Sequence, residues 1–286
     1  MSLAVAIDAL ELGIIFAIMS FGVFVSYKIL NIPDMTTDGS FTTGCAVSAL
    51  FALHGHPIIG LFAALIAGAC AGMITGFLQT KCKVAPLLSG ILTMTALYSI
   101  NLKIMGNQPN ISVFGKDTIF TLLKDFGSQH KLIIVLMLLL ITATILFIFL
   151  KTQLGMSLRA TGDNEAMVRA SSINSDFMKL LGLALANALV AFGGAVFAQY
   201  QNFADVSGGV GMMVVGLAGI IVGDAFFRKD GMVSKFLAVM FGAIGYRFLL
   251  TIALQFGIPA GDLNLFSALL VAIAISIPHF KKKGAH

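Results

Sequence analysis

Charged residues are scarce in this sequence: they make up only 11% of its 286 residues, against about 25% in a typical soluble domain. Hydrophobic residues account for 58%. A chain of this composition has too few polar side chains to cover its surface, so it would not stay soluble as a monomer. The composition therefore excludes a soluble monomeric protein and indicates a chain that lies within a lipid bilayer.

Several motifs that carry chemistry are also missing. The phosphate-binding pattern GxxxxGK[ST] does not occur, because the nearest fragment, residues 115–118, lacks the upstream glycine and has no Ser or Thr directly after its lysine. His54 and His56 have no neighbours that would complete a zinc site, and the three cysteines have no paired spacing. We therefore expect no metal and no bound cofactor on this chain. A membrane-embedded enzyme is the least favoured class, since no compact catalytic set stands out.

Long apolar blocks are what the sequence has instead. Each is close to the roughly 20 residues that a helix needs to cross about 30 Å of hydrocarbon. Nine can be marked, at residues 9–30, 39–54, 57–80, 85–103, 132–150, 179–203, 208–227, 232–256 and 263–280. The second and seventh are short and contain glycine. We predict an all-α polytopic membrane helix bundle of about nine segments, some short or broken, in a single transmembrane domain over residues 1–286.

Basic residues gather at the ends of these segments rather than on one soluble face, which argues against nucleic-acid binding. The polar loop 151–178 is richer in basic groups than the loop 104–131, so the positive-inside rule places it in the cytoplasm. Alternate threading then puts thirteen basic residues inside, namely Lys28, Lys81, Lys83, Lys151, Arg159, Arg169, Lys179, Arg228, Lys229, Lys235 and Lys281 to Lys283. Four lie outside, namely Lys103, Lys116, Lys124 and Lys131. The bias predicts an odd number of crossings, with the N-terminus outside and the C-terminus cytoplasmic.

An internal repeat emerges when the chain is shifted by 171 residues. Phe21, Gly22, Val25, Asn31, Asp34 and Thr36 then fall on Phe192, Gly193, Val196, Asn202, Asp205 and Ser207. Chance similarity between apolar stretches is the alternative explanation. A real match makes 9–103 the first repeat, 132–150 a linking segment and 179–280 the second repeat. The single linking segment would place the two repeats in opposite orientations, as is typical of transporters.

The coupling loop, residues 151–178, contains the strongest local pattern, LGMSLRATGDNEAMVRASSINSDF at 154–177. Asp163 can cap a short helix, and Glu165 suits the positive end of its dipole. Met167, Val168 and Ile173 give that helix an apolar side. The helix could lie on lipid headgroups, or it could dock a soluble partner.

The residues that follow carry a family resemblance. LRATGDN at 158–164, A-x-x-x-A-S-S-I-N at 166–174, QYQNFADVSGGVGMMVVGLAGIIVGD at 199–224 and ILNIPDMTTDGSFTTG at 29–44 resemble the permeases of ABC importers for branched-chain amino acids and sugars. The branch that serves amino acids such as tryptophan or tyrosine is more similar. One departure is Ser172, where the family usually has glycine.

The resemblance implies a transport subunit rather than an enzyme. A cytoplasmic ABC ATPase dimer would bind ATP and Mg, an external binding protein would deliver the substrate, and a second copy of the permease would complete the path across the bacterial inner membrane. The residues expected to couple to the ATPase are Gly162, Asp163, Asn164, Glu165, Ala166, Arg169, Ala170, Ile173 and Asn174. The implied substrate is a small solute, with an aromatic amino acid favoured.

Polar residues that interrupt the apolar sequence are candidates for the substrate pathway, because broken helices can present their dipole ends to a substrate. They are Asn31, Asp34, Thr36 and Asp38 in the first half and Asn202, Asp205 and Ser207 in the second. The alternative for the first patch is an ordinary turn and helix start after Pro33. Asp34 and Asp205 are also the only obvious paired acids for the runner-up function, an ion-coupled secondary transporter.

Two further features concern packing. Glycines recur every four residues at Gly68, Gly72 and Gly76, and again at Gly219 and Gly223, which allows helices to approach closely. Arg247 and Asp224 lie in or at the end of apolar segments, where an ion pair between them is possible. Snorkelling of the long arginine side chain to an interface is the alternative.

Overall fold

The computed structural model describes residues 3–122, 130–227 and 231–257, with scattered positions between 259 and 272. The expected ninth segment, 263–280, lies largely outside the described residues, and Lys281 to Lys283 lie wholly outside them.

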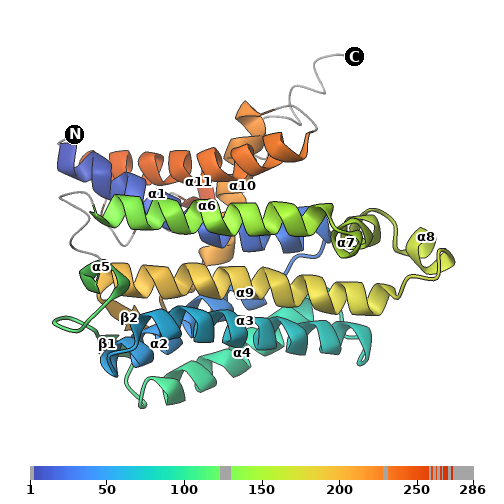
Figure 1. The fold of residues 1–286 in the computed structure, drawn as a ribbon, viewed down its shortest axis with the longest axis horizontal. Coiled ribbons are helices and arrows are strands. Elements are labelled where there is room, and N and C mark those ends of the chain that lie inside the picture. Colours follow the sequence, from blue (N-terminus) through green and yellow to red (C-terminus); the bar gives the residue numbers. More distant parts are fainter. Residues whose placement is uncertain are drawn as a thin grey trace.

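The described chain is helical apart from two short strands and connecting turns (Figure 1). The first half consists of α1 (Leu3–Val23), a π-helical turn η1 (Phe24–Ile29), α2 (Thr36–Leu53), α3 (Pro57–Thr80) and α4 (Pro86–Ile104). Then follow β1 (Asn110–Ser112), α5 (Ile119–Leu122), α6 (His130–Lys151), α7 (Gln153–Asp163) and α8 (Glu165–Ala170). The last part holds α9 (Ser175–Gln201), β2 (Phe203–Asp205), α10 (Met212–Phe226) and α11 (Met232–Gln255). Each of the first eight apolar blocks of the sequence lies on one of these helices.

Local sequence explains several helix boundaries. Proline opens α3 and α4, at a position where its missing N–H costs no hydrogen bond. The side chains of Thr152, Asn164 and Asn174 accept backbone hydrogen bonds at the starts of α7, α8 and α9. The expected cap, Asp163, is therefore wrong: it is the last residue of α7, and the following Asn164 has the extended backbone of a cap.

Six helices of the described chain are long and apolar enough to cross a membrane: α1 with η1, α3, α4, α6, α9 and α11. The most apolar stretches of α1 and α9 are 94% and 72% buried, whereas those of the other four are less than half buried. Large apolar side chains such as Phe62, Ile66 and Ile145 point outward from α3 and α6. An apolar exterior around two buried central helices is the arrangement of a polytopic membrane protein.

The two central helices run antiparallel and in contact. Phe16 of α1 stacks on Phe197 of α9 at 5.9 Å between ring centroids, and a Cβ on Gly193 would lie 2.9 Å from the Cβ of Met19. Further along, a Cβ on Gly22 would lie 2.6 Å from a methyl carbon of Val190. In the 171-residue alignment Met19 corresponds to Val190 and Gly22 to Gly193, so the two contacts are reciprocal.

Glycines mark the closest helix approaches. On α3, a Cβ added at Gly68 or Gly72 would collide with the α9 backbone, at Asn187 and Leu183, and one at Gly76 would lie 2.9 Å from Leu180 Cα. On α10, Gly219 and Gly223 face Ala243 and Ala238 of α11 in the same way. These five positions lie at α3–α9 and α10–α11 contacts within the described chain.

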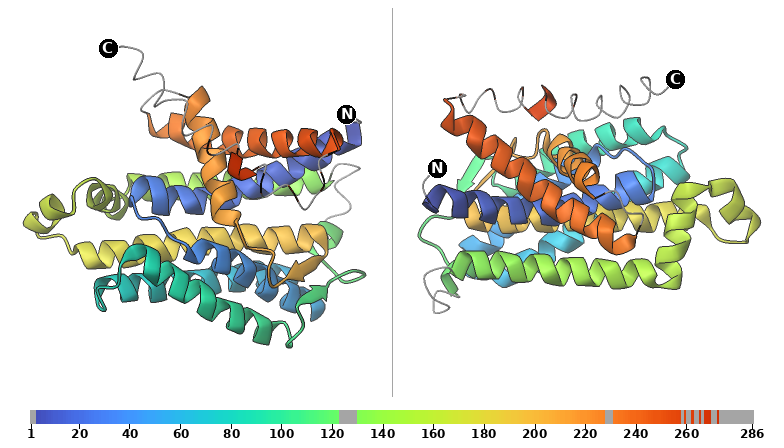
Figure 2. Two further views of the ribbon diagram at one scale, coloured as in Figure 1. Left: turned by 180° about the vertical axis from the view of Figure 1, so that it is seen from behind. Right: turned by 90° about the horizontal axis from the view of Figure 1, so that it is seen from above.

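The two ends of the bundle differ. Helices α7 and α8 extend beyond the bundle at one end, and β1, β2 and α5 lie at the other, together with the N-terminus (Figures 1 and 2). Strands β1 and β2 pair antiparallel, with Asn110 opposite Asp205. The two long polar loops of the sequence therefore cap opposite ends of the molecule.

Candidate functional site

The expected coupling residues form a compact projection at the end of the bundle. Gly162 and Asp163 end α7, Asn164 forms the bend, and Glu165, Ala166, Arg169 and Ala170 lie on α8, from which Ile173 and Asn174 lead into α9. The side-chain oxygen of Asn164 accepts a hydrogen bond from the Met167 N–H at 3.0 Å. Met167 is 58% exposed. The projection thus presents an apolar side chain to whatever lies beyond the bundle.

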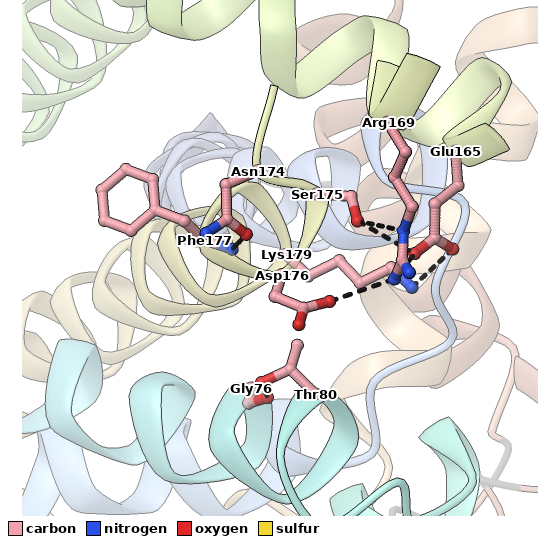
Figure 3. Close-up of polar contacts among 9 residues, drawn as sticks. All are labelled: Gly76, Thr80, Glu165, Arg169, Asn174, Ser175, Asp176, Phe177 and Lys179. Carbon is pink, nitrogen blue, oxygen red and sulfur yellow. Dashed lines mark hydrogen bonds and ion pairs between the residues drawn. The ribbon is translucent and has the colours of Figure 1, made fainter. Parts of the chain in front are cut away.

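An ionic network fixes α8 to the first turn of α9 (Figure 3). Lys179 Nζ lies 2.7 Å from Glu165 Oε2, and Arg169 Nη2 lies 2.8 Å from Glu165 Oε1 and 3.2 Å from Asp176 Oδ1. Arg169 Nε also donates to the Ser175 hydroxyl at 2.8 Å. Because both acidic partners share one guanidinium, α8 cannot rotate on α9 without breaking several of these bonds.

Sequence reasoning missed three of the five residues in this network. The spacing of four between Glu165 and Arg169 is a readable helix signal. Ser175, Asp176 and Lys179 join only because the chain reverses at residues 171–174, which brings the start of α9 beside α8. Ser172 adopts a left-handed φ of 60° in that reversal, a conformation that glycine adopts without strain.

The network sets the protonation of Glu165. The hydrogen bond from Lys179 is the largest cause that lowers the pKa of Glu165 from its ordinary value of 4.5, and it acts against partial burial. A carboxyl with a depressed pKa in the folded state stabilises the structure above its unfolded pKa, and this contribution is lost as the pH falls through the folded value.

We therefore expect the attachment of α8 to be constant between pH 7 and pH 5 and to weaken only below about pH 4.5, the usual range of a free glutamate. A spin label at M167C, in a background without the exposed Cys70 and Cys82, measures this as a rise in mobility at acid pH. Glu165→Gln should show the high mobility at every pH. A wild-type transition near neutral pH would contradict the assignment.

The first polar turn, residues 31–36, contains a fully buried carboxylate. Asp34 Oδ1 accepts from the Thr36 N–H at 2.9 Å, and Oδ2 accepts from the Asn187 amide of α9 at 2.7 Å. Ser40 donates to the other side of Asn187 at 2.7 Å. Within the described chain, Asp34 forms no ion pair, and its hydrogen-bond partners are neutral groups.

A line of threonines extends from this turn across three helices. The hydroxyls of Thr36 and Thr75 lie 2.7 Å apart, and Thr75 donates to Thr93 at 2.9 Å. All three side chains are buried. Thr36 belongs to the polar patch found in the sequence, whereas Thr75 and Thr93 lie within apolar segments, and their spacing in the sequence does not indicate that the three hydroxyls meet. Together with Asp34 it forms a continuous polar seam through α2, α3 and α4.

Asp38 connects the two halves of the chain. Its carboxylate oxygens accept from the N–H groups of Gly211, at 2.9 Å, and Met213, at 2.7 Å, where α10 begins. A negative charge at this position satisfies orphan N–H groups and complements the helix dipole. Asp38, in the first turn of α2, therefore anchors the start of α10.

The second polar turn, residues 202–207, shares two features with the first. Asn202 has φ 61° and Asn31 has φ 56°, and Asp205 Oδ1 accepts from the Ser207 N–H at 2.7 Å as Asp34 does from Thr36. This turn is half-exposed and pairs with β1 at the end of the bundle opposite to α7 (Figure 1). The seven candidate pathway residues thus do not form one cluster.

The ion pair considered between Arg247 and Asp224 is wrong. Asp224 lies 2.7 Å from Lys28 of η1, and the guanidinium of Arg247 lies over the ring of Phe16 at 5.5 Å. The two residues thus contact different parts of the first membrane segment, η1 and α1. Among the described residues, no group of three or more His, Cys, Asp or Glu could hold a metal ion.

Comparison with known proteins adds the family context. The model of a family described as branched-chain amino acid transport system / permease component matches residues 5–277. The tyrosine transport system permease protein of Clostridioides difficile strain R20291 is 38% identical over 266 residues, covering 93% of this chain and 88% of that protein. The ribose import permease protein RbsC of Escherichia coli strain K12 is 21% identical over 243 residues, with 84% and 74% covered. The solved structure of PsaBC from Streptococcus pneumoniae in complex with Fab shares the fold, with a TM-score of 0.53 and 18% identity over 94% of this chain and 89% of that one.

Proposed function

The chain belongs to the family of branched-chain amino acid transport system permease components, and from this premise we propose that it forms the translocation path of an ATP-driven importer together with a second copy of itself. Membership confirms the resemblance read from the sequence. It makes the chain a multi-pass membrane protein and the permease component of an ABC-type transporter, a transport subunit rather than an enzyme.

The observation that carries the proposal is the α7–α8 projection. Its ionic network anchors α8 rigidly to α9, while Met167 and the hollow of about 320 Å³ beside Arg169 and Ile173 face outward. A cytoplasmic ATPase that binds ATP and Mg would seat on this surface, since the chain has no phosphate-binding motif of its own. The proposal places the coupling loop on the cytoplasmic side of a bacterial inner membrane, and the charge bias of the sequence puts the C-terminus on the same side.

The proposed path is an inverted repeat with about nine crossings. The reciprocal contacts between Met19 and Gly193 and between Gly22 and Val190 support it, because an exchange of equivalent residues is the signature of two-fold symmetry. The antiparallel course of α1 and α9 agrees with opposite orientations of the two halves. The left-handed Asn31 and Asn202 support the same alignment.

The proposed substrate is an amino acid, with an aromatic one favoured, because the Clostridioides relative is named for tyrosine. A binding protein at the end that carries β1 and β2 would deliver it. The polar turns and the threonine seam would line its route. The alternative, an ion-coupled secondary transporter, is weakened because the carboxylates of Asp34 and Asp205 are each engaged by backbone N–H groups of their own turns.

Reconstitution tests the proposal. Proteoliposomes that contain the chain, its partner ATPase and its binding protein should accumulate labelled tyrosine only when ATP is supplied on the ATPase side. A sodium or proton gradient without ATP should give no uptake. Uptake driven by either gradient in the absence of ATP would favour the secondary transporter. Competition by ribose but not by phenylalanine would overturn the amino-acid assignment.

A further inference from the structure

The backbone of α7 rests directly on the segment that leads into the first polar turn. A Cβ added to Gly162 would collide with the carbonyl oxygen of Ile29 and lie 2.9 Å from the Cα of Leu30. Only glycine lets two backbones approach so closely. The coupling loop therefore touches this segment through rigid main chain, which transmits displacement better than a flexible side chain does.

Leu30 extends this contact to α9. Its side chain is buried, and a Cβ on Gly182 would lie 2.5 Å from Leu30 Cδ1 and 2.7 Å from Cδ1 of Leu158 on α7. Leu30 is thus packed where α7 and α9 meet. A close-packed interior has low compressibility, so movement of either helix displaces Leu30.

Leu30 is joined to the buried carboxylate by a short, well-defined stretch of chain. The Leu30 N–H donates to Val25 at 3.0 Å and the Ile32 N–H to Ser26 at 2.9 Å, which closes the end of η1. Asn31 then turns the chain with a left-handed φ. Asp34 follows, and its partner Asn187 belongs to α9. A shift of this segment relative to α9 must change the Asp34–Asn187 hydrogen bond.

The coupling loop therefore contacts two different parts of the chain, α9 and the segment that leads into the first polar turn. Its α8 end is held to the first turn of α9 by Lys179 and Asp176, and its α7 end sits on Ile29 and Leu30. The same two parts are joined by the hydrogen bond between Asp34 and Asn187. A rotation of the loop moves its two ends by different amounts. It therefore changes the geometry of the Asp34–Asn187 hydrogen bond.

The corresponding turn in the second half is held differently. The Val113 N–H donates to Asn202 at 2.8 Å, and Asp205 pairs with Asn110 of β1. No glycine of a coupling loop takes part there. The contact of α7 with the segment before the first turn therefore has no equivalent at the second turn, so the shape of the turn does not require it.

We propose that Gly162, Leu30 and Gly182 form the junction through which movement of the coupling loop reaches the polar seam at Asp34. They are positioning residues, which act through the Asp34–Asn187 hydrogen bond. The inference rests on the proposed function, because it takes the partner ATPase as the source of the movement.

Gly162→Ala tests the junction in the complete complex with ATPase and binding protein. We expect assembly and ATP hydrolysis to persist while tyrosine import per ATP falls by about tenfold, within the usual range of coupling between sites. Gly155→Ala is the matched control. It adds the same methyl group to the same helix, where it would collide with the Phe149 carbonyl at the α6–α7 elbow, and it should keep import per ATP close to the wild-type value.

Gly182→Ala gives a second, independent test away from the ATPase surface. It should lower import per ATP because the new methyl group displaces Leu30, and adding Leu30→Ala should restore most of the loss by making room for it. Equal losses in the Gly162 and Gly155 variants, or no rescue by Leu30→Ala, would overturn the junction. A wild-type complex without ATP-dependent import would instead refute the proposed function itself.

Discussion

Replacing both Glu165 and Arg169 with alanine is expected to lower the affinity of the permease for its proposed partner ATPase by about tenfold to a hundredfold, as loss of an interface hot spot does. The reason is structural. The two residues hold α8 on α9 through Lys179, Ser175 and Asp176, and without them the six-residue helix α8 is too short to persist alone. Binding then has to order the helix as well as contact it.

Titration of detergent-solubilised permease against the purified ATPase measures this effect. Lys81→Ala serves as the control, since Lys81 is an exposed basic residue assigned to the same side of the membrane but lies outside the coupling loop. The control should bind with wild-type affinity. Normal ATPase affinity together with normal ATP-coupled import in the double variant would remove the coupling loop from the docking site.

Asn187→Leu is expected to destabilise the fold by about 3 kcal/mol, because it removes the amide that donates to the buried carboxylate of Asp34 at 2.7 Å. Leucine has a similar size, so little of this cost comes from a cavity. The Ser40 hydroxyl loses its acceptor as well. Reversible unfolding in mixed detergent micelles gives the free energy of unfolding.

Two further variants separate charge from packing. Asp34→Asn added to Asn187→Leu removes the unpaired charge and should recover about half of the lost stability. Ser20→Ala is the control, because Ser20 is buried and its hydroxyl has no hydrogen-bond partner within the described chain; it should change the free energy by less than about 0.5 kcal/mol. No recovery in the double variant would show that the charge of Asp34 is not the cause.

Much of the helical framework could be read from the sequence. Apolar blocks of spanning length gave the helices, and Pro57 and Pro86 gave two of their starts, because these signals are local. The family resemblance also extended over most of the chain, and the match over residues 5–277 bears it out. The number of crossings stays a prediction, since the ninth block lies largely outside the described residues.

The contacts between distant segments could not be read in this way. Lys179 and Asp176 join Glu165 and Arg169 only after the chain reverses, and Thr75 and Thr93 meet Thr36 only when three helices pack. Arg247 and Asp224 were paired because both are charged in apolar surroundings, yet Lys28 lies nearer to Asp224. Sequence spacing predicts partners within one helix and says little about which helices become neighbours.

The reciprocal packing of α1 on α9 also bears on how the protein is made. Synthesis delivers α1 and Asp34 to the membrane long before Asn187 exists, since 152 residues lie between Asp34 and Asn187 in the sequence. Until α9 is synthesised, Asp34 lacks its amide partner Asn187 and α1 lacks the helix that packs against it. The first half alone therefore leaves a polar group unpaired in the bilayer, and we expect the fold to become stable only when the second half packs against it.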